Sequence, residues 1–69
     1  MKAYKVYVEM ETSLRDDTYT DEYNGVAYAD RDLADVVKAD ARRELSMASN
    51  YIGAFVKEVD VPEYEVFVA

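Results

Sequence analysis

The sequence contains no cysteine, histidine or tryptophan, and it has only two glycines and one proline in 69 residues. Without cysteine the chain cannot form a disulfide, and without cysteine or histidine a structural zinc site is nearly excluded. The most common general base is also missing, and isolated glycines cannot form a glycine-rich phosphate-binding loop. We therefore expect no enzymatic activity, no metal and no cofactor.

Basic residues are also few, because eight lysines and arginines stand against fifteen aspartates and glutamates, which leaves a net charge of −7. This charge opposes direct binding to nucleic acid and to anionic membranes, so a protein partner is expected to be basic. A chain this short buries only about 60% of its unfolded surface, so its core is expected to be marginal. A bound partner or a second copy would supply the missing stability.

The length is that of one domain, and we assign residues 1–69 to a single unit. No apolar run approaches the roughly 20 residues that span a bilayer, and the N-terminal residues alternate instead of forming a signal-peptide core. Apolar residues make up 51% of the chain and include seven tyrosines, enough for a folded core. We expect a cytoplasmic protein that does not bind membranes.

Alternation with a period of two predicts a strand over residues 3–10, with Tyr4, Val6 and Val8 on one face and Tyr7 and Glu9 on the other. Residues 31–48 are predicted to form a helix, since Leu33, Val37, Ala41, Leu45 and Ala48 recur at helical spacing. Asp30 or Asp32 is its N-cap, and with Asp32 as the cap, Asp35 lies at the position that completes an acidic capping arrangement. Lys38, Arg42 and Arg43 are interpreted as a solvated face paired with neighbouring acids.

Residues 12–22 are polar, and two interpretations are open for the segment that follows. Asn24-Gly25 either closes a tight hairpin between strands 18–23 and 26–29, or lies as a glycine bulge within one strand over residues 22–29. We prefer the bulge, because Thr18–Asp21 has no apolar alternation. Strands are also predicted over residues 52–61 and 63–68, with Pro62 between them at a turn or edge.

The predicted order is ββαββ, and the fold class is α+β. We expect a two-layer sandwich with about four antiparallel strands and one helix on one face of the sheet. The opposite face would remain uncovered. It is expected to carry Tyr7 from the first strand, Tyr28 or Val26 from the second, and Phe67 from the last.

The uncovered face would combine these aromatic residues with the carboxylates of Glu9, Glu11, Glu63 and Glu65. Tyrosine supplies apolar area and a polar tip, so this composition is typical of a protein interface. Ordinary cross-strand packing on a solvated sheet would produce the same pattern. Both interpretations are retained.

An acidic segment, Asp16, Asp17, Asp21 and Glu22, places four carboxylates within seven residues. It lacks the spacing of a calcium-binding loop, so a metal site is not expected. A solvated loop is the simplest interpretation. Alternatively, these carboxylates imitate phosphates and bind a basic protein.

Three segments, YKVYVEM, YNGVAYADRDLADVVKADARREL and FVKEVDVPEYEVFV, give the chain a layout that resembles many short phage and plasmid proteins. Among such proteins, it is most similar to the strongly acidic anti-CRISPR and DNA-mimic inhibitors. The resemblance implies a phage or mobile-element protein that binds a nucleic-acid-handling enzyme, such as a CRISPR-Cas effector, and blocks it. It covers most of the chain but supplies no site residue.

Two functional hypotheses follow. The first is a non-enzymatic inhibitor whose binding surface combines Asp16, Asp17, Asp21 and Glu22 with Tyr7, Glu9, Tyr28 and Phe67. The second is a self-associating accessory protein, a homodimer held through the uncovered sheet face. Salt distinguishes them, because an electrostatic complex weakens as salt rises and an apolar dimer does not.

Overall fold

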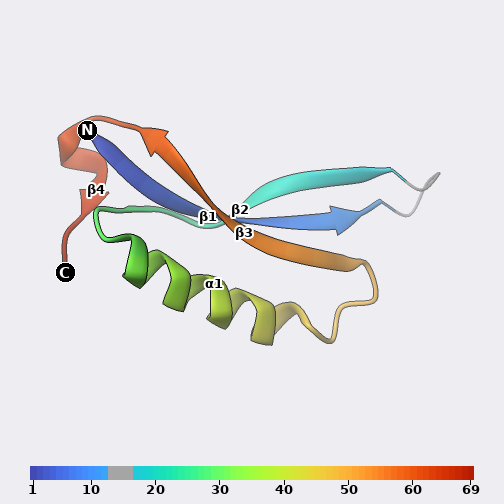
Figure 1. Cartoon of the computed structure of the whole chain (residues 1–69). Helices are drawn as coiled ribbons and strands as arrows, with labels where there is room; N and C mark the ends of the chain where they lie inside the picture. Colours follow the sequence, from blue (N-terminus) through green and yellow to red (C-terminus); the bar gives the residue numbers. More distant parts are fainter. Residues whose placement is uncertain (13–16) are drawn as a thin grey trace.

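The computed structural model describes residues 1–12 and 17–69. Its elements, in chain order, are β1 (Lys2–Glu11), β2 (Thr18–Tyr28), α1 (Arg31–Leu45), β3 (Tyr51–Asp60), a 3-10 turn η1 (Glu63–Glu65) and β4 (Val66–Phe67). The strands form one four-stranded sheet in the order β3-β1-β2-β4, and α1 lies along one face of it (Figure 1). The predicted α+β class, with a single helix on one face, is confirmed.

The central strand is β1, which pairs antiparallel with β2 on one side and with β3 on the other. β4 differs from the prediction, because it is only two residues long and runs parallel to β2. Pro62 and the 3-10 turn after it redirect the chain from the end of β3 towards the far edge of β2. After this crossing β4 runs in the same direction as β2, so the sheet contains both antiparallel and parallel strand pairs.

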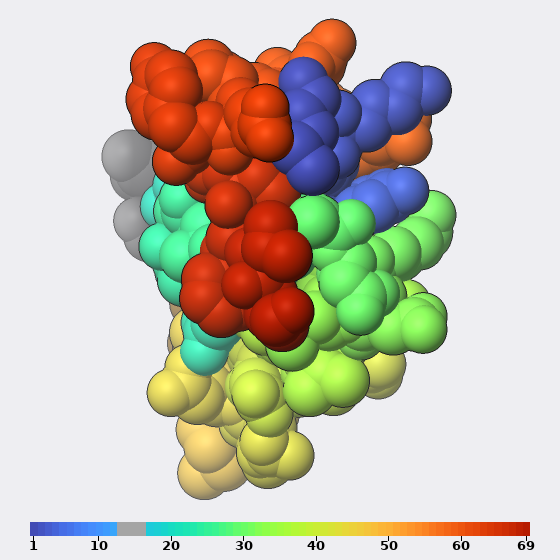
Figure 2. All heavy atoms as spheres, turned by 90° about the vertical axis from the view of Figure 1, so that its left-hand side faces the viewer, coloured from blue at the N-terminus to red at the C-terminus, as the bar shows by residue number. Residues whose placement is uncertain are grey.

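The crossing segment, residues 61–65, lies on the face of the sheet opposite α1 (Figure 1). Val61 and Glu65 line a small hollow there with Lys5 and Ala27. Figure 2 shows this end of the molecule, where the C-terminal residues (orange to red) lie beside the N-terminal residues (blue). The face that was predicted to be bare is therefore covered at one end, and Ala3 and Ala27 are buried.

The glycine bulge in β2 is confirmed and the tight hairpin is not formed, but the predicted bounds of 22–29 are wrong, because the strand already begins at Thr18 and ends at Tyr28. Lys5 faces Ala27 while Tyr7 faces Glu22, so one residue of β1 lies opposite residues 23–26 of β2. Gly25 has a φ of 72°, a left-handed conformation that favours glycine. Asn24 stabilises the backbone of the bulge, because its Oδ1 accepts a hydrogen bond of 3.1 Å from the Val26 amide.

The helix begins after Asp30, whose Oδ1 accepts a 2.8 Å hydrogen bond from the amide of Asp32. Of the two predicted N-caps, Asp30 is therefore the one used. The helix ends at Leu45, so the prediction that it reaches Ala48 is wrong by one turn. The Ala48 amide instead donates to the carbonyl of Leu45 and closes the final turn.

The core lies between α1 and the sheet and is small. Its buried members are Val6, Val8, Tyr28, Ala34 and Ala41. The two alanines let the helix approach the sheet closely, but they also bury little apolar area. Val6 is the largest fully buried side chain among the described residues, and the predicted helix positions Leu33, Val37 and Leu45 are only partly buried around it.

Candidate protein-interaction site

The predicted acidic loop does not exist as a unit in the described residues. Asp16 lies outside them, and Asp17 alone precedes β2, whereas Asp21 and Glu22 belong to the strand. Asp21 pairs with Val8 and faces α1, while Glu22 pairs with Tyr7 and faces the other way. Period-two alternation thus sends the two carboxylates to opposite faces of the sheet.

Glu22 is partly neutralised within the protein. Its Oε1 accepts a 2.8 Å hydrogen bond from the Nζ of Lys5, across the β1–β2 pair. This hydrogen bond raises the pKa of Lys5 above its ordinary value, and partial burial opposes the rise. Glu22 is therefore a weaker candidate for binding a basic partner than Asp21.

The predicted aromatic surface of Tyr7, Tyr28 and Phe67 is also divided between the two faces. Tyr28 pairs with Tyr4 and is only 7% exposed in the core on the helix side, so its predicted place on the uncovered face is wrong. Phe67 contacts Tyr28 edge to face, with ring centroids 5.9 Å apart, and is therefore separated from Tyr7. The bulge in β2 causes the difference, because its extra residues reverse the alternation of side chains after Glu22.

The helix-free face instead carries a pair formed by Tyr7 and Phe55, which lie opposite each other on β1 and β3. Their rings stack with centroids 5.6 Å apart and planes inclined by 16°. Glu9 faces Gly53 on the same side of the sheet. Phe55 was missed as a candidate because, although it alternates correctly in the sequence, only the strand register brings it to Tyr7.

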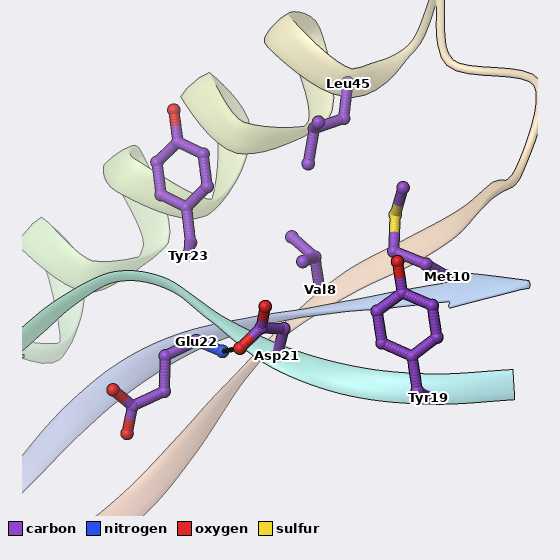
Figure 3. Close-up of a pocket in the computed structure, with 7 residues that line it drawn as sticks. All are labelled: Val8, Met10, Tyr19, Asp21, Glu22, Tyr23 and Leu45. Carbon is purple, nitrogen blue, oxygen red and sulfur yellow. Dashed lines mark hydrogen bonds between the residues drawn. The ribbon is translucent and has the colours of Figure 1, made fainter. Parts of the chain in front are cut away.

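A second surface, which the sequence did not predict, is a groove on the helix side of the sheet (Figure 3). It has a volume of about 280 Å³ and lies between the far half of the β1–β2 pair and the end of α1. Its lining residues are Val8, Met10, Tyr19, Asp21, Glu22, Tyr23 and Leu45. We refer to these seven residues as the α1-side groove.

Apolar side chains form most of this groove, and carboxylates lie at its edge. Val8 is buried at the base, and Tyr19 is 45% exposed at the rim. Asp21 lies beside Tyr19 in Figure 3, whereas the carboxylate of Glu22 points away from the groove. None of the described residues that line the groove is basic.

The carboxylate of Glu44, on α1, extends the negative charge beyond the groove. The hydroxyl of Tyr23 donates a hydrogen bond to it. This hydrogen bond raises the pKa of Tyr23, with burial and the charges of Glu44 and Asp40 adding to the rise. The tyrosine hydroxyl thus remains a donor, and Glu44 is fixed near one end of the groove.

No protein-family model, curated protein or solved structure matches this chain. Within residues 1–12 and 17–69, no three acidic, histidine or cysteine side chains are grouped as a metal site. The single described helix, α1, is too short and too polar to cross a bilayer.

Proposed function

We propose that the protein is a non-enzymatic interaction module that binds a basic partner protein through the α1-side groove. The groove is the observation that carries the proposal, since it exposes apolar side chains beside the carboxylates of Asp21 and Glu44. A lysine or arginine can lay its aliphatic stem on Met10 and Leu45 while its charged end meets Asp21.

The net charge of −7 supports the same function. A field of this sign raises the rate at which a cationic protein meets the groove, and it repels competing nucleic acid and other acidic proteins. The apolar lining would then determine how long the complex lasts, because burial of apolar area acts mainly on dissociation.

Within this class, we propose an inhibitor from a phage or mobile element whose partner is a nucleic-acid-handling protein, such as a CRISPR-Cas effector. The resemblance to acidic anti-CRISPR and DNA-mimic proteins supports this assignment, as does the use of carboxylates where nucleic acid presents phosphates. The same charge and the missing histidine and cysteine favour binding over catalysis.

Self-association through the helix-free face is a second candidate. It is favoured by the Tyr7–Phe55 stack, because Phe55 is 38% exposed on a face that α1 does not cover. Aromatic pairs of this kind are enriched in protein interfaces. The charge of each copy opposes the association, so such a dimer would tighten as salt screens the repulsion.

The test measures binding to purified cationic nucleic-acid-binding proteins, CRISPR-Cas effectors among them, at about 50 and 200 mM salt. We expect the double variant Asp21→Asn, Glu44→Gln to associate more slowly and with a weaker salt dependence than the unaltered protein. Glu58→Gln with Glu63→Gln is the matched control, since it removes two exposed charges outside the groove.

Equal effects of the two double variants would contradict the role of the groove. Sedimentation at several protein concentrations addresses the second candidate, for which Tyr7→Ala with Phe55→Ala should dissociate the dimer. If the protein stays monomeric at every protein concentration and salt concentration tested, self-association is contradicted.

A further inference from the structure

The outer edge of β2 has no strand partner over its first half. β1 pairs with one side of this segment, and on the other side β4 pairs only with Ala27 and Tyr28. Within the part of the chain that the structure describes, residues 18–22 therefore form an open sheet edge. All five are exposed.

Two hydrogen bonds establish which backbone groups point outward. The amide of Thr12 donates to the carbonyl of Asp17 at 2.7 Å, while the amide of Glu11 donates at 2.7 Å to Asn50, on the opposite side of β1. Hydrogen-bonded and non-hydrogen-bonded pairs alternate along an antiparallel ladder. Glu11 and its partner Thr18 are thus a non-hydrogen-bonded pair.

By the same alternation, Tyr19 and Asp21 direct their backbone groups towards β1, and Thr18, Thr20 and Glu22 direct theirs outward. The outward amide of Glu22 is already occupied, since it donates to the Oδ1 of Asp21 at 3.0 Å. Thr18 and Thr20 remain as the positions where an added strand would form its ladder. This edge is a template for strand addition.

The open edge and the α1-side groove adjoin each other, because Tyr19, Asp21 and Tyr23 belong to both β2 and the groove lining. A strand placed along the edge would direct every second side chain to the helix side, next to these three residues. In a segment whose residues alternate, the apolar side chains would reach the groove, and the basic side chains would lie on the helix-free face beside Glu22.

The negative charge along β2 indicates whether the added strand comes from another protein or from a second copy of this chain. Antiparallel pairing of two β2 edges would place Asp17, Asp21 and Glu22 of both copies along one ribbon, and like charges across strands are destabilising. A segment rich in lysine or arginine is attracted by the same carboxylates. The occupant is therefore basic.

We propose that an extended segment of the partner, with basic and apolar residues in alternation, adds as a strand to residues 18–22 of β2 and places its apolar side chains in the α1-side groove. This inference rests on the proposed function and specifies its mode of binding. β4 already adds to the other half of the same edge, so the new strand would continue the sheet alongside it.

The test titrates the isotope-labelled protein with a synthetic peptide of alternating lysine and valine, capped at both ends. We expect amide exchange at Thr18 and Thr20 to slow by about tenfold or more, because a ladder hydrogen bond protects both groups. Contacts between peptide protons and the β2 edge should appear in isotope-filtered NMR spectra. A peptide of alternating glutamate and valine is the charge control and should not bind.

Two further lysine–valine peptides test the backbone ladder without altering the protein. One is N-methylated at its odd-numbered residues and the other at its even-numbered residues. An added strand uses one set of amides, so one methylated peptide should lose about tenfold in affinity while the other keeps it. Equal losses, protection on the β3 edge instead, or a helical bound peptide would overturn strand addition. So would a failure of the parent peptide to bind.

The proposed function has a different readout. If strand addition is overturned but cationic proteins still bind with a rate that depends on Asp21 and Glu44, the interaction module stands and only the mode of binding is wrong. If the parent peptide assembles the protein into dimers without occupying residues 18–22, self-association is the correct alternative. Loss of the salt-dependent binding itself would remove both proposals.

Discussion

The ring of Phe67 stands edge-on to the ring of Tyr28, with their planes inclined by 81°. Tyr28 belongs to the core, so this contact ties the two-residue strand β4 to the centre of the protein. The Ala29 amide also donates to the carbonyl of Phe67 at 3.0 Å. Such a short strand has few backbone hydrogen bonds, and its attachment depends largely on the aromatic pair.

We predict that Phe67→Ala lowers the free energy of unfolding by about 1–2 kcal/mol, from the lost edge-to-face contact and the lost apolar burial. Urea denaturation measures the change. Val68→Ala is the control, since Val68 is 70% exposed and should alter stability by less than about 0.5 kcal/mol. Equal losses for the two variants would show that the Phe67 ring does not hold β4.

Val6→Ala is predicted to be more destabilising than Leu45→Ala, although leucine loses more atoms. Val6 is fully buried in the thin core, so its truncation leaves a cavity and costs about 2–3 kcal/mol. Leu45 lines the open groove, where water replaces the lost atoms, and we expect about 1–2 kcal/mol. The reverse order in urea denaturation would mean that the groove is closed in solution.

Tyr51→Phe is predicted to leave stability unchanged or to raise it by up to about 1 kcal/mol. Its hydroxyl oxygen is buried and has no hydrogen-bond partner among the described residues. A buried polar group without a partner is destabilising, so its removal should be favourable. Thermal denaturation provides the measurement, with Tyr19→Phe as a neutral control at an exposed position. A clear loss of stability would reveal a partner for the Tyr51 hydroxyl.

Glu44→Gln is predicted to lower the pKa of Tyr23 towards its ordinary value of 10.0, because the hydrogen bond to this carboxylate is the main cause of the raised pKa. A raised pKa stabilises the fold below pH 10 or so, and the contribution disappears as pH rises through the folded-state pKa. NMR titration of the labelled tyrosine ring gives the pKa directly. Glu63→Gln should leave it unchanged, and a similar shift in this control would exclude a specific effect of Glu44.

Local periodicity was sufficient to predict β1, α1 and most of β3. Tyr4, Val6 and Val8 alternate with polar residues, and the helix carries its apolar positions at the expected spacing. Local periodicity failed to predict a strand over residues 18–22, because these residues have no apolar alternation. They form a strand only because β1 extends far enough to pair with them. Strand pairing overrode the weak local preference.

The candidate site, like the fold, could be predicted from the sequence only in part. The sequence identified Asp21 and Tyr7 as surface residues of interest, but counting along β2 could not place Tyr28, because the bulge reverses the faces after Glu22. The α1-side groove combines residues from β1, β2 and the end of α1, which are far apart in the sequence. No local pattern marks such a set.

The amino-acid sequence by itself determined the α+β class, the helix with an aspartate cap at Asp30 or Asp32, the acidic charge and the absence of cysteine and histidine. These are properties of composition and of short-range spacing. The tertiary structure alone decided the parallel direction of β4, the Tyr7–Phe55 stack, the burial of Tyr28 and the open edge beside the groove. Each of these depends on strand register and on how the chain crosses the sheet, which are set by contacts between distant segments and not by neighbouring residues.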